Sequence, residues 1–76
     1  MTEKEWNIEA EKVLLNRKIV EVRYMTKTEV KKMGWCKRPI MFTLDNGEYC
    51  IVSMDDEGND GGSLFYGEDG TLPTLS

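Results

Sequence analysis

Apolar residues near the start of the chain recur at the spacing of a helix. They lie at positions i, i+4, i+7 and i+8 and form one apolar stripe: Trp6, Ala10, Val13 and Leu14. Thr2 and Glu5 have the spacing of a capping box, in which each side chain satisfies a free backbone amide of the first turn. Asn16 tolerates the left-handed conformation that ends many helices. The pattern predicts a helix over residues 3–15, with the stripe facing a core.

A strand and a second, shorter helix are predicted next. Residues 17–25 alternate apolar and charged positions and are rich in β-branched and aromatic residues, which is typical of a strand. Thr26 and Glu29 form a second capping box, and Gly34 is a natural helix terminator. We therefore expect a helix over about 27–33, which is too short to be stable without tertiary contacts.

The third pattern is a β-hairpin. Residues 40–45 and 48–54 flank Asn46 and Gly47, a dipeptide that favours a two-residue turn. In that register Leu44 pairs with Tyr49 and Phe42 with Ile51. It also places the carboxylates of Asp45 and Glu48 opposite each other, which is unfavourable, so a loop of three or four residues is the alternative.

The last third of the chain is rich in glycine and acidic residues. Residues 55–62 contain three glycines and no apolar residue, which predicts a loop. A short strand is expected at 63–66, followed by a turn at 67–70 and an extended tail at 71–76, in which Pro73 excludes a central strand. The resulting fold class is α+β. A small antiparallel sheet of three to four strands, with an SH3-like half-barrel as the specific alternative, packs on the N-terminal helix, and a second short helix lies between the first two strands.

Length and composition restrict the function. The 76 residues fit one small domain, divided into an N-terminal helix (1–16), a β-rich core (17–66) and a tail (67–76). Histidine is absent, which removes imidazole bases, His-dependent nucleophiles and His-containing metal sites. Cys36 and Cys50 do not make a disulfide framework, so we expect a cytoplasmic protein. No membrane segment, cofactor, resident metal or catalytic constellation is predicted, and we expect the protein not to be an enzyme.

The net charge of −4 is divided unevenly along the chain. All ten Lys and Arg lie in residues 1–44 with six acidic residues, whereas residues 45–76 contain eight acidic residues and no base. The densest acidic group is the candidate surface for a protein partner: Asp55, Asp56, Glu57 and Asp60. The same oxygen-rich, glycine-rich loop is a weaker candidate for a hard cation. It does not fit an EF-hand, because Gly58 and Gly67 occupy ligand positions of that motif.

A basic segment supplies the alternative function. Its residues could contact phosphates around one stacking aromatic side chain: Lys31, Lys32, Trp35, Lys37 and Arg38. The competing interpretation is a solvated helix face with Trp35 packed beneath it. The acidic overall charge and the lack of a known nucleic-acid motif favour that second interpretation.

Several short motifs occur together in the middle of the chain. They are Arg23-Tyr24-Met25-Thr26, Gly34-Trp35, Arg38-Pro39, Leu44-Asp45-Asn46-Gly47 and the acidic, glycine-rich run of residues 53–62. In this combination the chain resembles a group of small phage and bacterial proteins over residues 17–66. The resemblance implies a phage-type accessory protein in the host cytoplasm. It assigns no activity and no residue role.

These observations together predict a non-catalytic protein that acts by binding another protein, of host or phage origin. A nucleic-acid-associated protein is the second hypothesis and a cation-binding module the third. The oligomeric state is left open.

Overall fold

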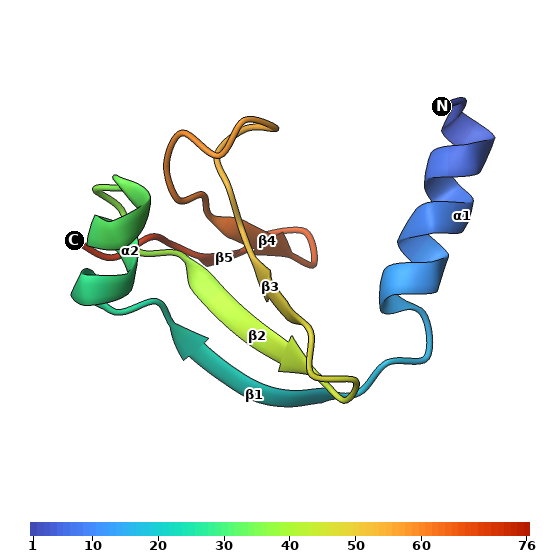
Figure 1. Cartoon of the computed structure of the whole chain (residues 1–76), viewed down its shortest axis with the longest axis horizontal. Helices are drawn as coiled ribbons and strands as arrows, with labels where there is room; N and C mark the ends of the chain where they lie inside the picture. Colours follow the sequence, from blue (N-terminus) through green and yellow to red (C-terminus); the bar gives the residue numbers. More distant parts are fainter.

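The computed structural model describes all residues, 1–76, as an α+β fold (Figure 1). Two helices, α1 (Glu3–Leu14) and α2 (Lys27–Met33), accompany five short strands. The strands are β1 (Ile19–Tyr24), β2 (Ile40–Leu44), β3 (Tyr49–Ile51), β4 (Leu64–Tyr66) and β5 (Gly70–Leu72). The predicted α+β class, with a second short helix between the first two strands, is confirmed. Neither helix is long and apolar enough to cross a membrane.

Both helices begin with the predicted capping boxes. In α1 the Glu5 amide donates to the Thr2 hydroxyl at 3.2 Å, and the Thr2 amide donates to the Glu5 carboxylate at 3.1 Å. In α2 the corresponding Thr26–Glu29 distances are 3.1 and 2.8 Å. Gly34 ends α2 in the left-handed conformation, with φ of 76°. These contacts are local, so the sequence spacing was sufficient to predict them.

The main sheet has three antiparallel strands in the order β1-β2-β3. The expected fourth strand, β4, instead pairs with β5 in a separate two-stranded sheet. The turn predicted at 67–70 joins β4 to β5, and the predicted tail is wrong for Thr71 and Leu72, which belong to β5. Arg38 and Leu75 also exchange backbone hydrogen bonds of 2.9 Å, so the end of the chain is tied to the segment that precedes β2.

The β2–β3 register differs by one residue from the two-residue-turn prediction. Phe42 pairs with Cys50 and Met41 with Ile51, and the Leu44 amide donates to the Glu48 carbonyl oxygen at 2.8 Å. The loop therefore has three residues, with Gly47 at φ of 89°, and the alternative prediction is the correct one. This register avoids the opposition of Asp45 and Glu48. Because a one-residue slip exchanges the two faces of a strand, Met41 and Ile51 point to the side of the sheet that α2 covers.

A small core lies between α2 and the sheet. Met25, Val30 and Trp35 form its buried cluster, and Met41 and Ile51 pack against them. All three members of the cluster are at most 6% exposed. No residue of α1 belongs to this core.

The prediction that the sheet packs on α1 is wrong. No residue of α1 is buried, and Trp6, Val13 and Leu14 are 59%, 40% and 50% exposed. Figure 1 shows α1 standing away from the sheet, at the opposite end of the molecule from α2. The radius of gyration is 13.5 Å, whereas a compact chain of this length would have about 11 Å. Residues 15–18 join α1 to β1, with Asn16 at φ of 63°, and α1 buries no residue against the sheet, where Val20 and Val22 also stay exposed.

Candidate functional site

The acidic loop, residues 55–60, is held in place by one of its own carboxylates. Asp60 Oδ1 accepts the amides of Cys36, Lys37 and Gly61 at 3.1, 2.9 and 2.8 Å. These hydrogen bonds, above all that from Lys37, keep the pKa of Asp60 below its ordinary value. Asp60 therefore connects the loop to the segment after α2, and its carboxylate is engaged within the chain.

Asp55 has a similar internal role. Its Oδ1 accepts the amides of Glu57 and Asn59 at 3.0 and 3.2 Å, and its Oδ2 accepts the Asn59 side-chain amide at 2.7 Å. The Asn59 side chain is the largest cause of the lowered pKa of Asp55. Of the four predicted contact residues, Asp56 and Glu57 are therefore the ones whose carboxylates face solvent most freely; Glu57 accepts only a long 3.5 Å hydrogen bond from Asn59.

The carboxylate oxygens of the acidic loop do not converge on one point where a cation could bind. The chain contains no group of three or more Cys, Asp or Glu side chains arranged to hold a metal ion. Asp55 and Asp60 point onto backbone amides, so their oxygens serve as turn acceptors. The structure therefore shows no set of loop carboxylates that supports the cation hypothesis.

Trp35 fixes the other side of the same loop. The ring is buried, and its Nε1–H donates to the Gly58 carbonyl oxygen at 2.6 Å. Trp35 offers no open face for stacking on a base, so its expected role in nucleic-acid contact is wrong and the competing interpretation, a packed core tryptophan, is confirmed. The sequence could not reveal its partner, because Gly58 lies 23 residues away.

The basic residues of the alternative site fall into two groups. Lys31 and Lys32 lie on the exposed side of α2. Lys37 and Arg38 follow Trp35, and Arg38 is half-buried, with Nη1 donating to the Met25 carbonyl oxygen at 3.3 Å. A nucleic-acid contact would rest on these four cations alone.

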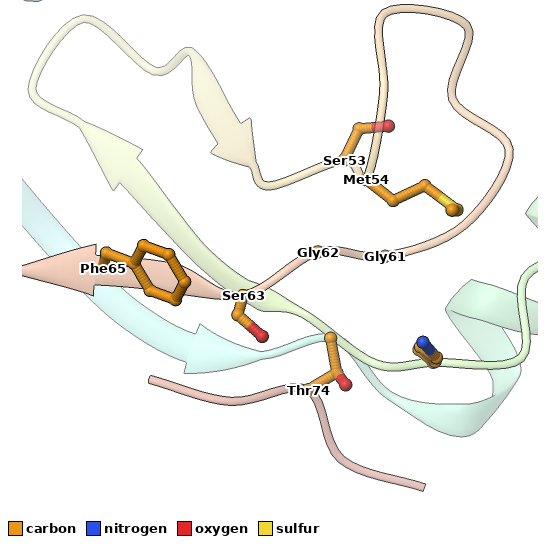
Figure 2. A pocket seen from close by; sticks show the side chains of 8 residues that line it. Ser53, Met54, Gly61, Gly62, Ser63, Phe65 and Thr74 are labelled. Atoms are coloured by element: carbon orange, nitrogen blue, oxygen red, sulfur yellow. The ribbon is translucent and has the colours of Figure 1, made fainter. Parts of the chain in front are cut away.

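A polar hollow of about 300 Å³ lies beside the loop. Figure 2 shows that its walls come from Ser53 and Met54 before the acidic loop, from residues 61–63 after it, and from Thr74 of the tail. Gly61 is required here, because a Cβ atom would lie 2.7 Å from the Lys37 carbonyl oxygen. Lys37 is the one charged residue in the lining, so the hollow holds no acid–base pair.

A second hollow, which we call the methionine groove, lies between α2 and the covered side of the sheet. Its volume is about 380 Å³. The lining is mainly apolar, with one acidic and one basic side chain: Met25, Met33, Met41, Tyr49, Ile51, Glu29 and Lys32. The sequence prediction missed this groove because the incorrect hairpin register placed Met41 and Ile51 on different faces.

One ion pair fixes the charge beside the groove. Arg23 donates two hydrogen bonds to Glu29, of 2.8 and 3.0 Å. Together with the Thr26 amide, this guanidinium lowers the pKa of Glu29 to about 2. Because Glu29 is neutralised by Arg23, the three lysines of α2 determine the local charge; none of Lys27, Lys31 and Lys32 forms an ion pair.

The remaining candidate surface is the stripe on α1, which we call the α1 stripe: Trp6, Ala10, Val13 and Leu14. All four residues are exposed. The stripe has the spacing of a buried helix face, yet nothing in the chain covers it.

Comparison with protein-family models, with curated proteins and with solved structures finds no significant match to this chain.

Proposed function

We propose that this chain is a non-catalytic protein-binding module and that α1 is its binding element. The observation that supports the proposal is the uncovered α1 stripe. A helix of 12 residues is marginal by itself in water. Burial of an amphipathic face normally supplies the missing stability, and in this chain that burial requires a partner.

Trp6 is the natural anchor of such a contact. Tryptophan is among the residues most enriched at the energetic centres of protein interfaces. Its 59% exposure leaves about 150 Å² of ring and stem in water, if a full tryptophan presents about 250 Å². Burying that area contributes roughly 3 to 4 kcal/mol at about 25 cal/mol per Å².

The acidic loop is the second contact surface in this proposal. Asp56 and Glu57 offer free carboxylates to a basic partner, while Asp55 and Asp60 hold the loop in shape. The resemblance to small phage and bacterial proteins makes a host or phage protein in the cytoplasm the expected partner. No reaction is assigned, because the polar hollow contains a single charged residue and the Glu29 carboxylate of the methionine groove is engaged by Arg23.

The test is affinity capture on the immobilised full chain from nuclease-treated lysate of the source cell. The matched variants are Trp6→Ser/Leu14→Ser in the α1 stripe and Ile8→Ser, which lies on the opposite side of α1 and is 46% exposed. We expect a stoichiometric protein to bind the wild type and the Ile8 variant and to be lost with the double variant. Equal capture by all three proteins would contradict the assignment to α1.

The acidic loop is tested separately with Asp56→Lys/Glu57→Lys. This pair leaves the internal hydrogen bonds of Asp60 in place, so the melting temperature should stay within the range of ordinary surface substitutions. Weaker capture at unchanged stability supports a contact through the loop, and unchanged capture removes the loop from the proposal.

A further inference from the structure

The chain contains both halves of a helix-in-groove contact, and neither half is occupied. The α1 stripe lacks a groove, and the methionine groove lacks a helix. Grooves rich in methionine suit amphipathic helices because the flexible, polarisable side chains adapt to the helix that enters. Met33 and Tyr49 are 46% and 66% exposed, so the groove is open to a second molecule.

We propose that the partner of α1 is a second copy of this chain, whose methionine groove receives the α1 stripe with Trp6 as the anchor. This inference rests on the proposed function, since it names the occupant of the same binding element. A two-fold dimer makes the contact twice, because the helix of each copy enters the groove of the other. The α1 stripe and the methionine groove of both copies are then covered by one symmetric arrangement.

Charge favours this pairing over a pairing of two α1 helices. α1 contains four acidic and two basic residues, a net charge of −2. α2, which forms one wall of the groove, contains three lysines and Glu29, a net charge of +2. The ion pair with Arg23 offsets the negative charge of Glu29, so the lysines dominate this wall of the groove. Two α1 helices side by side would repel each other, whereas α1 against α2 brings opposite charges together.

The chain exposes more surface than a compact monomer of its mass, and the excess is as large as one side of a stable dimer interface. The chain exposes 5986 Å², whereas a compact monomer of 8.8 kDa exposes roughly 4,800 Å² by the usual scaling with mass. The excess is about 1,200 Å² per copy, and stable interfaces bury about 800 Å² or more per partner. The groove volume of about 380 Å³ also falls in the range of pockets that hold a large side chain.

The fold keeps α1 away from the groove of its own copy. In Figure 1, α1 joins the start of β1 through residues 15–18, whereas α2 follows the end of β1. Exchange of an identical element between two copies is a common route to a dimer when the element stands free.

The test is sedimentation velocity of the full chain over low-micromolar to millimolar concentration, with four variants. Trp6→Ser/Leu14→Ser removes the stripe. Met33→Glu places an acid in the groove opposite the acidic helix, and Tyr49→Glu is a second groove variant in case the first disturbs folding. Ile8→Ser is the control. We expect the wild type and the control to dimerise, and the stripe and groove variants each to dimerise about 30-fold or more weakly, the effect of losing a hot spot.

An equimolar mixture of the stripe variant and a groove variant is the decisive experiment. The stripe variant retains an intact groove and the groove variant an intact helix, so an equimolar mixture should regain one of the two contacts and form heterodimers. A chain that is monomeric at every concentration overturns the inference. So does a dimer that tolerates either class of variant, or a mixture that does not associate. If the wild type is monomeric but α1-dependent capture of a different protein persists, the inference fails and the proposed function stands; if that capture is absent as well, both fail.

Discussion

Replacing Trp35 with phenylalanine tests how the small core and the acidic loop are joined. The substitution keeps an aromatic ring among Met25 and Val30 but removes the Nε1–H that donates to Gly58 at 2.6 Å. Gly58 is exposed, so its carbonyl oxygen can bind water after the change. The loss is therefore that of one ordinary hydrogen bond, about 1 kcal/mol, without an additional desolvation penalty.

The smaller ring adds a second contribution. Tryptophan buries about 50 Å² more than phenylalanine, which corresponds to about 1 kcal/mol at 25 cal/mol per Å². The expected sum is about 2 kcal/mol of the free energy of unfolding, a large share of the roughly 4 to 11 kcal/mol expected for a domain of this length. The melting temperature should fall by about 8 to 16 °C.

Urea denaturation followed by far-ultraviolet circular dichroism measures this change, at low protein concentration so that association does not contribute. The matched control is Phe65→Leu, since Phe65 is 78% exposed and its replacement should change stability by less than about 0.5 kcal/mol. A similarly small effect of Trp35→Phe would refute the claim that Trp35 joins the core to the loop.

Three further predictions concern Gly61, Asp60 and Glu29. Gly61→Ala should cost about 1 to 3 kcal/mol of stability in a urea titration, because its Cβ would lie 2.7 Å from both the Lys37 carbonyl oxygen and the Pro39 ring; Gly67→Asn, in open space at φ of 61°, should cost far less. Asp60→Ala should speed hydrogen exchange at the amides of Cys36 and Lys37, which lose their acceptor, whereas unchanged exchange there would show that Asp60 does not hold the segment. The pKa of Glu29 is about 2 in the folded chain and 4.5 in the unfolded chain, so its ion pair with Arg23 stabilises the fold fully above pH 4.5 and less as the pH falls toward 2. Glu29→Gln should therefore be less stable than wild type at pH 7 and equally stable near pH 2 in urea titrations. A difference in stability that does not depend on pH would contradict the role of this ion pair.

Local features of the fold could be predicted from the sequence. Both capping boxes, the left-handed Gly34 and the hairpin of β2 and β3 depend on residues close together in the chain. The hairpin register required a choice between two loops of similar propensity, and the repulsion of Asp45 and Glu48 was the signal that pointed to the correct one. The three-residue loop also places Met41 and Ile51 on one face of the sheet, where they line the methionine groove.

Tertiary placement could not be predicted in the same way. A stripe such as that of α1 indicates that a helix face is buried, but it does not say in which molecule. Similarly, the acidic loop consists of residues with the same chemistry, yet Asp55 and Asp60 are engaged by amides while Asp56 is free. Asp55 is engaged by Glu57 and Asn59 within the loop, whereas Asp60 is engaged by Cys36 and Lys37, more than 20 residues away, so spacing within the loop carries no information about the role of Asp60.

In our proposal α1 is a binding helix that only a partner covers. Hydrogen exchange of the α1 amides, measured by mass spectrometry over a range of protein concentrations, tests it most directly. We predict fast exchange in dilute protein, slower exchange as the concentration rises, and fast exchange at every concentration in Trp6→Ser/Leu14→Ser. Protection of α1 that is already complete in dilute wild-type protein would show that the helix packs within its own chain and would contradict the account.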